Sequence, residues 1–252
     1  MSFDVPGEDY DRFMGRYSRP LAQELVDLVG VVPGSRALDV GCGPGALTAV
    51  LAGRLGPERV SGVDPSASFV EACRAQVPGA DVRQGTAESL PFEDDSFDVA
   101  AANLVVHFMA DAVAGLTEMA RVTRPGCWVA ATVWDLAGRR APMAPVWDAL
   151  ERVAPGDPGE GHLPGGTAGE LETFFVEAGL TDVVGTELAV TVTHPTFEEW
   201  WAPYLHGVGP VGEVVERLGR EGRSRLEADL RQRLGAGPFD ITAVAHAARG
   251  RA

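Results

Sequence analysis

The chain has 252 residues, of which 45% are hydrophobic and 23% are charged, so its composition excludes a disordered chain and permits one large α/β domain. All 21 basic residues are arginine, which excludes Schiff-base chemistry on a lysine and any P-loop that needs its lysine. The formal net charge of −15 argues against nucleic acid, a dense polyanion, as the partner.

The main cluster of basic residues has a plain structural interpretation. Arginines between residues 217 and 233 alternate with glutamates and aspartates, which is typical of a solvated helix surface. Three cysteines without a C-x-x-C motif fit reduced thiols, and the five histidines show no zinc-site spacing. We therefore expect no metal.

Nothing in the sequence predicts a membrane protein. No run approaches the ~20 apolar residues that cross a bilayer, and residues 1–18 contain no apolar signal-peptide core. We therefore expect a cytoplasmic protein.

The first half of the chain alternates between strand-like and helix-like runs. Helical spacing of apolar residues predicts helices at about 46–55, 66–76 and 111–123. Short apolar runs predict strands at 36–40, 60–63, 81–84, 98–103 and 127–134. Repeated β-α units of this kind imply a parallel sheet with helices on both faces.

The second half is less regular. Residues 135–166 are rich in Pro and Gly and carry one predicted helix, at about 143–153. Further helices are expected at 168–179, 196–205 and 211–234, and strands at 182–193 and 239–249. No internal repeat or linker divides the chain.

The most informative segment is a glycine-rich turn between the first strand and the first helix of this pattern. Gly41, Gly43 and Gly45 allow a sharp turn and a close approach of the main chain to a ligand. Asp64 lies 23 residues beyond Gly41, at the end of the next strand, where a carboxylate can accept hydrogen bonds from both hydroxyls of a ribose. Together these features predict a nucleoside site at the carboxyl edge of the sheet.

Two cofactor classes fit this turn. The spacing from Gly41 to Ala46 formally matches the dinucleotide fingerprint, so spacing alone leaves NAD open. Asp39 argues against NAD because its carboxylate, just before the turn, would repel a pyrophosphate. S-adenosylmethionine instead carries a sulfonium and an ammonium, beside which a carboxylate is tolerated or useful.

These residues resemble a known family. The segment ALDVGCGPG resembles motif I of the class I S-adenosylmethionine-dependent methyltransferases, and the resemblance continues in the family's order over about residues 10–135. It includes the segments VSGVDPSASFVEACR, GTAESLPFEDDSFDVAAANLVVHFM and EMARVTRPGCWVAATVWD. The likeness is to the branch that contains the ubiquinone and menaquinone biosynthesis enzymes and many small-molecule methyltransferases.

The resemblance implies a fold and an organisation. We expect an α/β, doubly wound, Rossmann-like sheet of seven mostly parallel strands with an antiparallel last strand. Residues 1–252 would form a single methyltransferase domain, with a helical cover at 1–35 and a cofactor-binding core at 36–135. The C-terminal half, 136–252, would carry helical inserts at about 136–166 and 195–236 that form a substrate lid.

The resemblance also implies roles for the glycine turn and the two acids. Gly41, Gly43 and Gly45 would line the methionine and ribose part of S-adenosylmethionine. Asp39 would lie close to its amino-acid moiety, and Asp64 would bind the ribose hydroxyls.

Later motif residues would contact the adenine. The resemblance implies that Pro65 packs on the base and that Ala87 meets its edge through the main-chain N–H. Many relatives have an aspartate where this chain has Thr86, so the acceptor for the adenine amine is either the Thr86 hydroxyl or Glu88.

Asn103 and Leu104 would border the methyl group that is transferred. His107 follows them, and its side chain has the pKa class for proton removal near neutral pH, so it is the predicted general base. The alternative is that His107 only lines the pocket or caps the next helix.

The N-terminal stretch YDRFMGRYS resembles the family's leading helix, which folds over the cofactor. Arg16 is the candidate for the methionine carboxylate, because a guanidinium matches it with two hydrogen bonds, and Tyr10 is its companion. The alternative for Arg16 is an exposed helix arginine.

We expect the second half to supply the acceptor pocket. Its candidate lining residues are aromatic side chains and one methionine: Trp134, Met143, Trp147, Trp200, Trp201 and Tyr204. Each could equally be ordinary core packing. For the tryptophan pair we expect one in the core and one at the pocket.

The resulting hypothesis is an enzyme that transfers the methyl group of S-adenosylmethionine to a small-molecule acceptor, releasing S-adenosylhomocysteine. The alternatives are an NAD-dependent oxidoreductase and an S-adenosylmethionine-binding protein without catalysis. The sequence leaves open the acceptor, the methylated atom and the oligomeric state.

Overall fold

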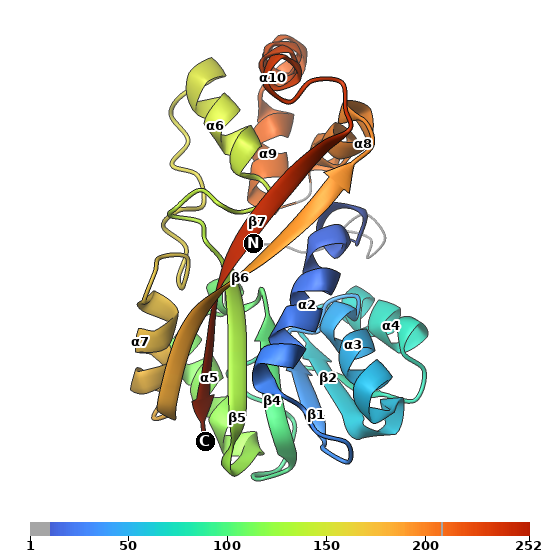
Figure 1. The fold of residues 1–252 in the computed structure, drawn as a ribbon, viewed down its shortest axis with the longest axis vertical. Helices are drawn as coiled ribbons and strands as arrows, with labels where there is room; N and C mark the ends of the chain where they lie inside the picture. Colours follow the sequence, from blue (N-terminus) through green and yellow to red (C-terminus); the bar gives the residue numbers. More distant parts are fainter. Residues whose placement is uncertain (1–10, 208) are drawn as a thin grey trace.

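The computed structural model describes residues 11–207 and 209–252. The strands are β1 (Ala37–Val40), β2 (Val60–Asp64), β3 (Asp81–Gln84), β4 (Phe97–Asn103), β5 (Thr123–Trp134), β6 (Thr181–His194) and β7 (Phe239–Arg251). They form one sheet in the order β3-β2-β1-β4-β5-β7-β6 (Figure 1). β1 to β5 are parallel to one another, whereas β7 is antiparallel to both β5 and β6. The expected sheet and antiparallel last strand are confirmed.

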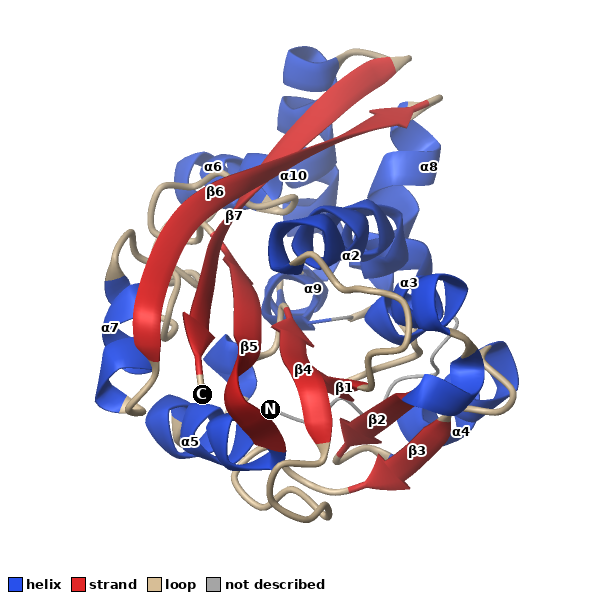
Figure 2. Cartoon of the chain, turned by 60° about the horizontal axis from the view of Figure 1, so that its bottom comes forward, coloured by secondary structure: helices blue, strands red, loops and turns tan. Residues whose placement is uncertain are grey.

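The α-helices are α2 (Arg16–Val29), α3 (Ala46–Leu55), α4 (Ala67–Gln76), α5 (Ala112–Val122), α6 (Ala144–Val153), α7 (Glu170–Glu177), α8 (Phe197–Trp201), α9 (Gly209–Arg217) and α10 (Gly219–Leu234). Shorter helical turns are η1 (Asp11–Gly15), η2 (Pro57–Arg59), η3 (Val106–Phe108) and η4 (Ala202–His206). Helices α2, α3 and α4 cover one face of the sheet and α5 and α7 the other (Figure 2). Among the described residues, no helix is both long enough and apolar enough to cross a bilayer.

The core strands are buried because helices cover both of their faces. All residues of β1 and β2 are buried, as expected for parallel strands inside such a layered fold. Helix α2 lies over this core through an apolar side that includes Leu21, Leu25 and Val29. The sheet therefore holds the carboxyl ends of β1, β2 and β4 in fixed positions.

Two predicted helices are shorter than expected. The helix expected at 211–234 is two helices, α9 and α10, because Gly219 at their junction has a left-handed φ of 65°. The helix expected at 196–205 ends as α8 at Trp201 and continues as the tighter turn η4. Pro203 lacks the N–H that an α-helix would need at that place.

Candidate functional site

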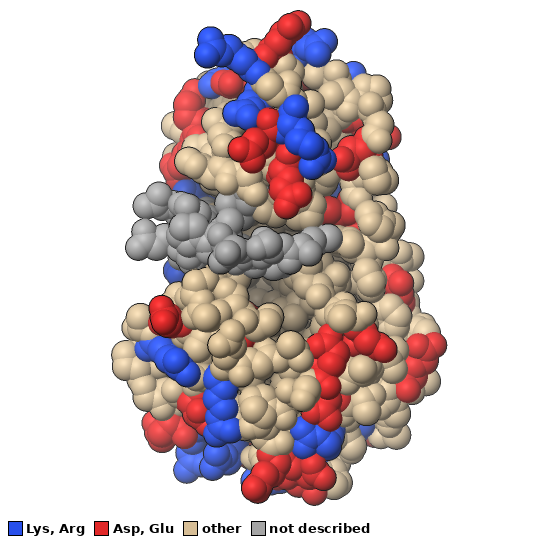
Figure 3. Space-filling model, turned by 180° about the vertical axis from the view of Figure 1, so that it is seen from behind, with Lys and Arg blue, Asp and Glu red and all other residues tan. Residues whose placement is uncertain are grey.

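A cavity of about 490 Å³ lies at the carboxyl ends of the parallel strands. Its wall is formed by the turns that follow β1, β2, β3 and β4, as expected for a doubly wound sheet. Seen from behind, the molecule is hollowed near its middle, and the atoms around the hollow are largely uncharged (Figure 3). Of the predicted cofactor residues, those in the lining are Asp39, Gly41, Gly43, Asp64, Pro65, Thr86, Ala87, Glu88, Asn103 and Leu104.

The glycine turn is shaped by left-handed main-chain conformations. Gly41, Gly43 and Gly45 have φ values of 69°, 52° and 106°. A Cβ on Gly41 would lie 2.5 Å from the side chain of Val105, so this position also requires a residue without a side chain. The N–H of Gly41 donates to the carbonyl of Val63 at 2.7 Å, which ties the turn to β2.

Asp64 joins the turn to the next strand. Its Oδ2 accepts a hydrogen bond from the N–H of Gly43 at 2.9 Å, and its Oδ1 accepts one from the N–H of Ser66 at 2.9 Å. Burial raises the pKa of this carboxyl, and the two main-chain hydrogen bonds oppose that effect. A carboxylate has about four lone-pair positions, so two acceptor positions remain for the hydroxyls of a ligand.

Asp39 is the second acid of the cavity wall. It is buried, and its Oδ2 accepts a hydrogen bond from the Thr48 hydroxyl at 2.6 Å. Burial raises the pKa of Asp39 to about 7, with the nearby charge of Asp64 adding to the effect. A cation next to Asp39 would favour its ionised form, whereas an anion would oppose it.

The segment after β3 brings Thr86, Ala87 and Glu88 into the lining. The Oε1 atom of Glu88 accepts a hydrogen bond from the N–H of Ala110 at 2.8 Å, so one of its oxygens holds the main chain before α5. The Thr86 hydroxyl has no such partner among the contacts of the described residues. Glu88 keeps its Oε2 atom as an acceptor and Thr86 keeps its hydroxyl, so both alternatives for the adenine amine stay predictions.

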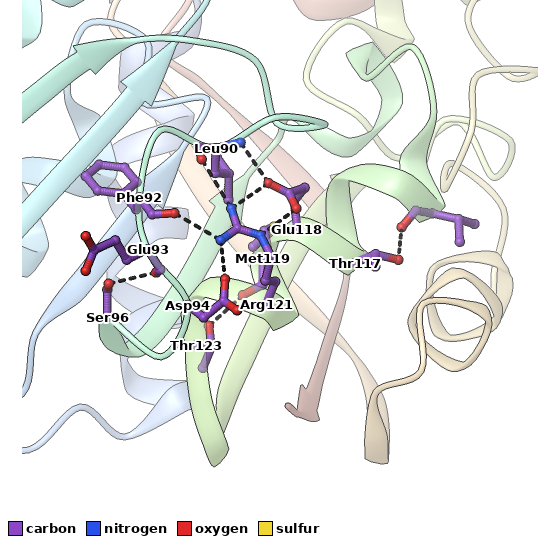
Figure 4. Close-up of polar contacts among 11 residues, drawn as sticks. Leu90, Phe92, Glu93, Asp94, Ser96, Thr117, Glu118, Met119, Arg121 and Thr123 are labelled. Carbon is purple, nitrogen blue, oxygen red and sulfur yellow. Dashed lines mark hydrogen bonds and ion pairs between the residues drawn. The ribbon is translucent and has the colours of Figure 1, made fainter.

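Arg121 fixes the loop that follows this segment. Its guanidinium donates to the carbonyls of Leu90 and Phe92, and it also pairs with Glu118 and Asp94 (Figure 4). Glu118 in turn accepts the N–H of Leu90 at 3.0 Å. These charge-assisted hydrogen bonds hold the loop to α5 and so support the side of the cavity where residues 86–88 lie.

Asn103 connects three elements at the end of β4. Its side-chain nitrogen donates to the carbonyl of Ser18 in α2 at 3.1 Å, and its oxygen accepts the Thr132 hydroxyl at 2.9 Å. Leu104, the next residue, has a left-handed φ of 65°, which is rare for a residue with a side chain. Its N–H is held by Thr132, so packing and hydrogen bonding maintain this strained turn beside the cavity.

Three predicted cofactor residues are not among the described lining residues. Tyr10 lies outside the described residues. Arg16 forms an ion pair with Glu199 at 2.6 Å. Gly45 starts α3 behind the lining and packs beside Cys73.

A second, smaller cavity of about 40 Å³ adjoins the first, because Leu104 and Phe108 line both. Besides Leu104, three predicted residues line it: His107, Trp134 and Met143. His107 is buried, and burial lowers its pKa to about 3. The imidazole is therefore neutral at pH 7 and is a weaker base than an exposed histidine.

The remaining aromatic candidates lie elsewhere. Trp200, Trp201 and Tyr204 are buried and pack on one another, with ring centroids 5.2 to 6.3 Å apart. Of the tryptophan pair, neither is in the described lining of either cavity. The indole nitrogen of Trp147 donates to Glu160 at 2.7 Å, so Trp147 supports the second cavity from behind.

Sequence reasoning missed several lining residues. Ser18 reaches the first cavity from α2, and Phe69 and Met109 reach it from the segments after β2 and β4. Their only signal was nearness in sequence to the motifs. Glu160, which lines the second cavity, stands in a Pro- and Gly-rich loop without periodicity.

Comparison with known proteins agrees with this geometry. Residues 38–131 match the family model described as a methyltransferase domain, and that range contains the glycine turn, Asp64 and Asn103. This match covers less than half of the chain, and it makes the matched region similar to a methyltransferase domain.

The chain is similar to curated methyltransferases. It is 39% identical over 99 residues to a probable phthiotriol/phenolphthiotriol dimycocerosates methyltransferase of Mycobacterium ulcerans, covering 38% of this chain and 38% of that protein. It is 36% identical over 110 residues to the demethylmenaquinone methyltransferase of Bacillus cereus, covering 41% of this chain and 46% of that protein. The matched segment thus spans less than half the length of either relative.

The fold extends beyond the methyltransferase domain match. The YcgJ protein of Bacillus subtilis superposes with a TM-score of 0.59 at 20% identity, over 92% of this chain and 98% of that one. This likeness shows that most of the chain has the fold of that structure.

The similarity to methyltransferases implies S-adenosylmethionine, and the first cavity fits it. A volume of about 490 Å³ is within the usual range of small-molecule sites. Asp64 has acceptor positions left for a ribose, and Asp39 suits a ligand with positive charge but not a pyrophosphate. The fit therefore favours S-adenosylmethionine over NAD.

Proposed function

We propose that the protein transfers the methyl group of S-adenosylmethionine to a small-molecule acceptor. The observation that supports this most directly is the placement of Asp64. Its carboxylate lines the cavity and is oriented by the N–H groups of Gly43 and Ser66, each at 2.9 Å. In that position it can accept hydrogen bonds from both ribose hydroxyls. The glycine turn lets the main chain approach the rest of the cofactor closely.

Methyl transfer mainly requires that the chain position the acceptor atom relative to the methyl group. The sulfonium of the bound cofactor supplies an activated methyl group, and the reaction is an in-line displacement that releases S-adenosylhomocysteine. The chain must hold the acceptor atom ~3 Å from the methyl carbon, opposite the sulfur, and exclude water. The second cavity suits this task because it meets the first at Leu104 and Phe108.

His107 is proposed to act on an acceptor that must lose a proton. It lines the second cavity beside Leu104, so its position supports the role. The lowered pKa of His107 disfavours its protonated form. His107 can therefore take a proton from the acceptor only when the bound acceptor stabilises the resulting imidazolium. A role in orienting the acceptor by a hydrogen bond needs no such stabilisation.

We infer that the two C-terminal inserts cover the acceptor. Met143 and Glu160 come from residues 136–166, and Gly209 and Val211 come from residues 195–236, and all four line the second cavity. Their convergence supports the proposed single-domain organisation of residues 1–252, with a lid over the cofactor core. The cytoplasmic location and the exclusion of nucleic acid as substrate stay predictions.

Calorimetry tests the proposed cofactor. We expect S-adenosylmethionine and S-adenosylhomocysteine to bind and NADH not to bind. Binding of NADH alone would replace the proposal by an oxidoreductase. A screen of small molecules for S-adenosylhomocysteine release then tests turnover, and binding without any release would favour the non-catalytic alternative.

A further inference from the structure

The second cavity contains a buried acid that the proposed methyl transfer does not use. Glu160 is 6% exposed and lines the cavity together with His107 and Trp134. Its Oε2 accepts one hydrogen bond, from the indole nitrogen of Trp147 at 2.7 Å. A carboxylate out of water is costly unless it is paired or well hydrogen-bonded.

The surroundings of Glu160 contain little positive charge. Among the side chains that the structure describes, no arginine forms an ion pair with it and none lines the cavity. Burial is the largest influence on the pKa of Glu160 and raises it, the hydrogen bond from Trp147 and the exposed His162 lower it, and Asp157 raises it. No described side chain pairs with the Glu160 carboxylate as a positive charge inside the cavity. A cationic ligand bound there would supply that charge.

The other walls suit a small organic cation. Phe13, Phe108 and Trp134 give the cavity aromatic sides, and aromatic rings attract cations through their faces. A second buried polar group points the same way, since Nδ1 of His107 has no hydrogen-bond partner among the described residues. A neutral imidazole can accept a hydrogen bond from an ammonium through such a nitrogen.

The size of the cavity limits what it holds. At about 40 Å³ it has room for a head group of about three water-sized units, since one water needs about 10–15 Å³ by the same measure. A head group there would leave the rest of the molecule directed toward Leu104 and Phe108, where the two cavities meet.

We propose that the second cavity selects acceptors that carry a protonated amine, and that the Glu160 carboxylate binds this amine between the aromatic walls. This inference rests on the proposed function, because it takes the second cavity as the acceptor site and names the chemical class of that acceptor. The amine is the recognised group, and it is separate from the choice of the methylated atom.

The test compares benzylamine with benzyl alcohol, which have the same ring and differ in the head group. Affinities are measured by ligand-observed NMR on the full chain, with and without saturating S-adenosylhomocysteine. We expect benzylamine to bind at least tenfold more tightly than benzyl alcohol. Glu160→Gln, which keeps an oxygen for the Trp147 hydrogen bond, should remove this preference.

The control is Glu177→Gln, which removes the same charge from an exposed position on α7 and should leave both affinities unchanged. Equal affinities for the two probes in the wild type, or an unchanged preference in Glu160→Gln, would overturn the inference. The NMR titration without S-adenosylhomocysteine keeps this test independent of the cofactor. Failure to bind S-adenosylhomocysteine would instead contradict the proposed function.

Discussion

The hydroxyl of Tyr17 lies 2.7 Å from Nε2 of His194, although 177 positions separate the two residues in sequence. The contact is buried and joins α2 to the end of β6. Arg16, next to Tyr17 in α2, also forms an ion pair with Glu199 in α8. The helix that covers the cofactor core is thus attached to the segment that leads into the proposed lid.

Tyr17→Phe should lower the free energy of unfolding by about 1–3 kcal/mol, because it leaves a buried imidazole nitrogen without its partner. Urea denaturation followed by fluorescence measures the change. Tyr204→Phe is the control, since the Tyr204 hydroxyl makes only a 3.5 Å contact with the Pro142 carbonyl. An equal loss in both variants would show that the Tyr17 hydrogen bond has no special weight.

Asp64→Ala should weaken S-adenosylmethionine binding by at least about tenfold, because charge-assisted hydrogen bonds to the ribose are lost. Loss of the acceptor for the Gly43 N–H should add to the effect by loosening the glycine turn. Isothermal titration calorimetry measures the affinity. Asp27→Ala removes an exposed acid that pairs with Arg54 and should change nothing. Full affinity in Asp64→Ala would remove the main support for the proposed function.

Gly41→Ala should be more destabilising than Gly43→Ala. Both positions have left-handed φ, which costs a residue with a Cβ about 1–2 kcal/mol. Only at Gly41 would the Cβ also meet Val105, at 2.5 Å, and relieving such overpacking costs about 1–3 kcal/mol more. Thermal or urea unfolding gives both values.

Shortening the neighbour provides the check on this comparison. Adding Val105→Ala to Gly41→Ala should recover part of the lost stability, because the clashing methyl groups are gone. No recovery in the double variant would show that main-chain strain alone explains the loss at Gly41.

Asp39 should make stability depend on pH in the protein without cofactor. Its pKa of about 7 in the folded state is above the ordinary 3.8, so the folded state holds the proton more tightly than the unfolded state. The stabilising contribution is complete below pH 3.8 and is lost as pH rises through about 7. The cost of ionising the buried acid is then on the order of 4 kcal/mol at most.

Asp39→Asn should therefore be more stable relative to the wild type at pH 8 than at pH 5. The free energy of unfolding is measured for both proteins at both pH values. Taking the variant minus the wild type at each pH cancels the contribution of the other titrating groups. A difference that is the same at pH 5 and pH 8 would contradict the raised pKa.

The sequence predicted the first cavity well because strand ends are easy to locate. Asp39, Asp64 and Asn103 each lie at or next to the end of a short apolar strand, and parallel strands bring their carboxyl ends to one edge. Ser18 could not be found in this way, since it reaches the cavity from a helix whose packing is set by distant parts of the chain.

The acceptor side was harder to predict. Aromatic residues at helical spacing have the same pattern in a core and at a pocket, so Trp200 and Trp201 gave no signal that both are core residues. Arg16 has two possible anionic partners, the cofactor carboxylate and Glu199, and only the folded chain shows the ion pair with Glu199. Glu160 became visible only when the loop around it was folded.

The position of β7 has a consequence for how the molecule can be made. This strand follows every other element in the chain, yet it lies between β5 and β6. During synthesis, β6 leaves the ribosome before the strand that will attach it to the sheet. A nascent chain that stops before residue 239 would expose strand edges to chaperones and proteases, so synthesis of residues 239–251 should commit this sheet to its native order.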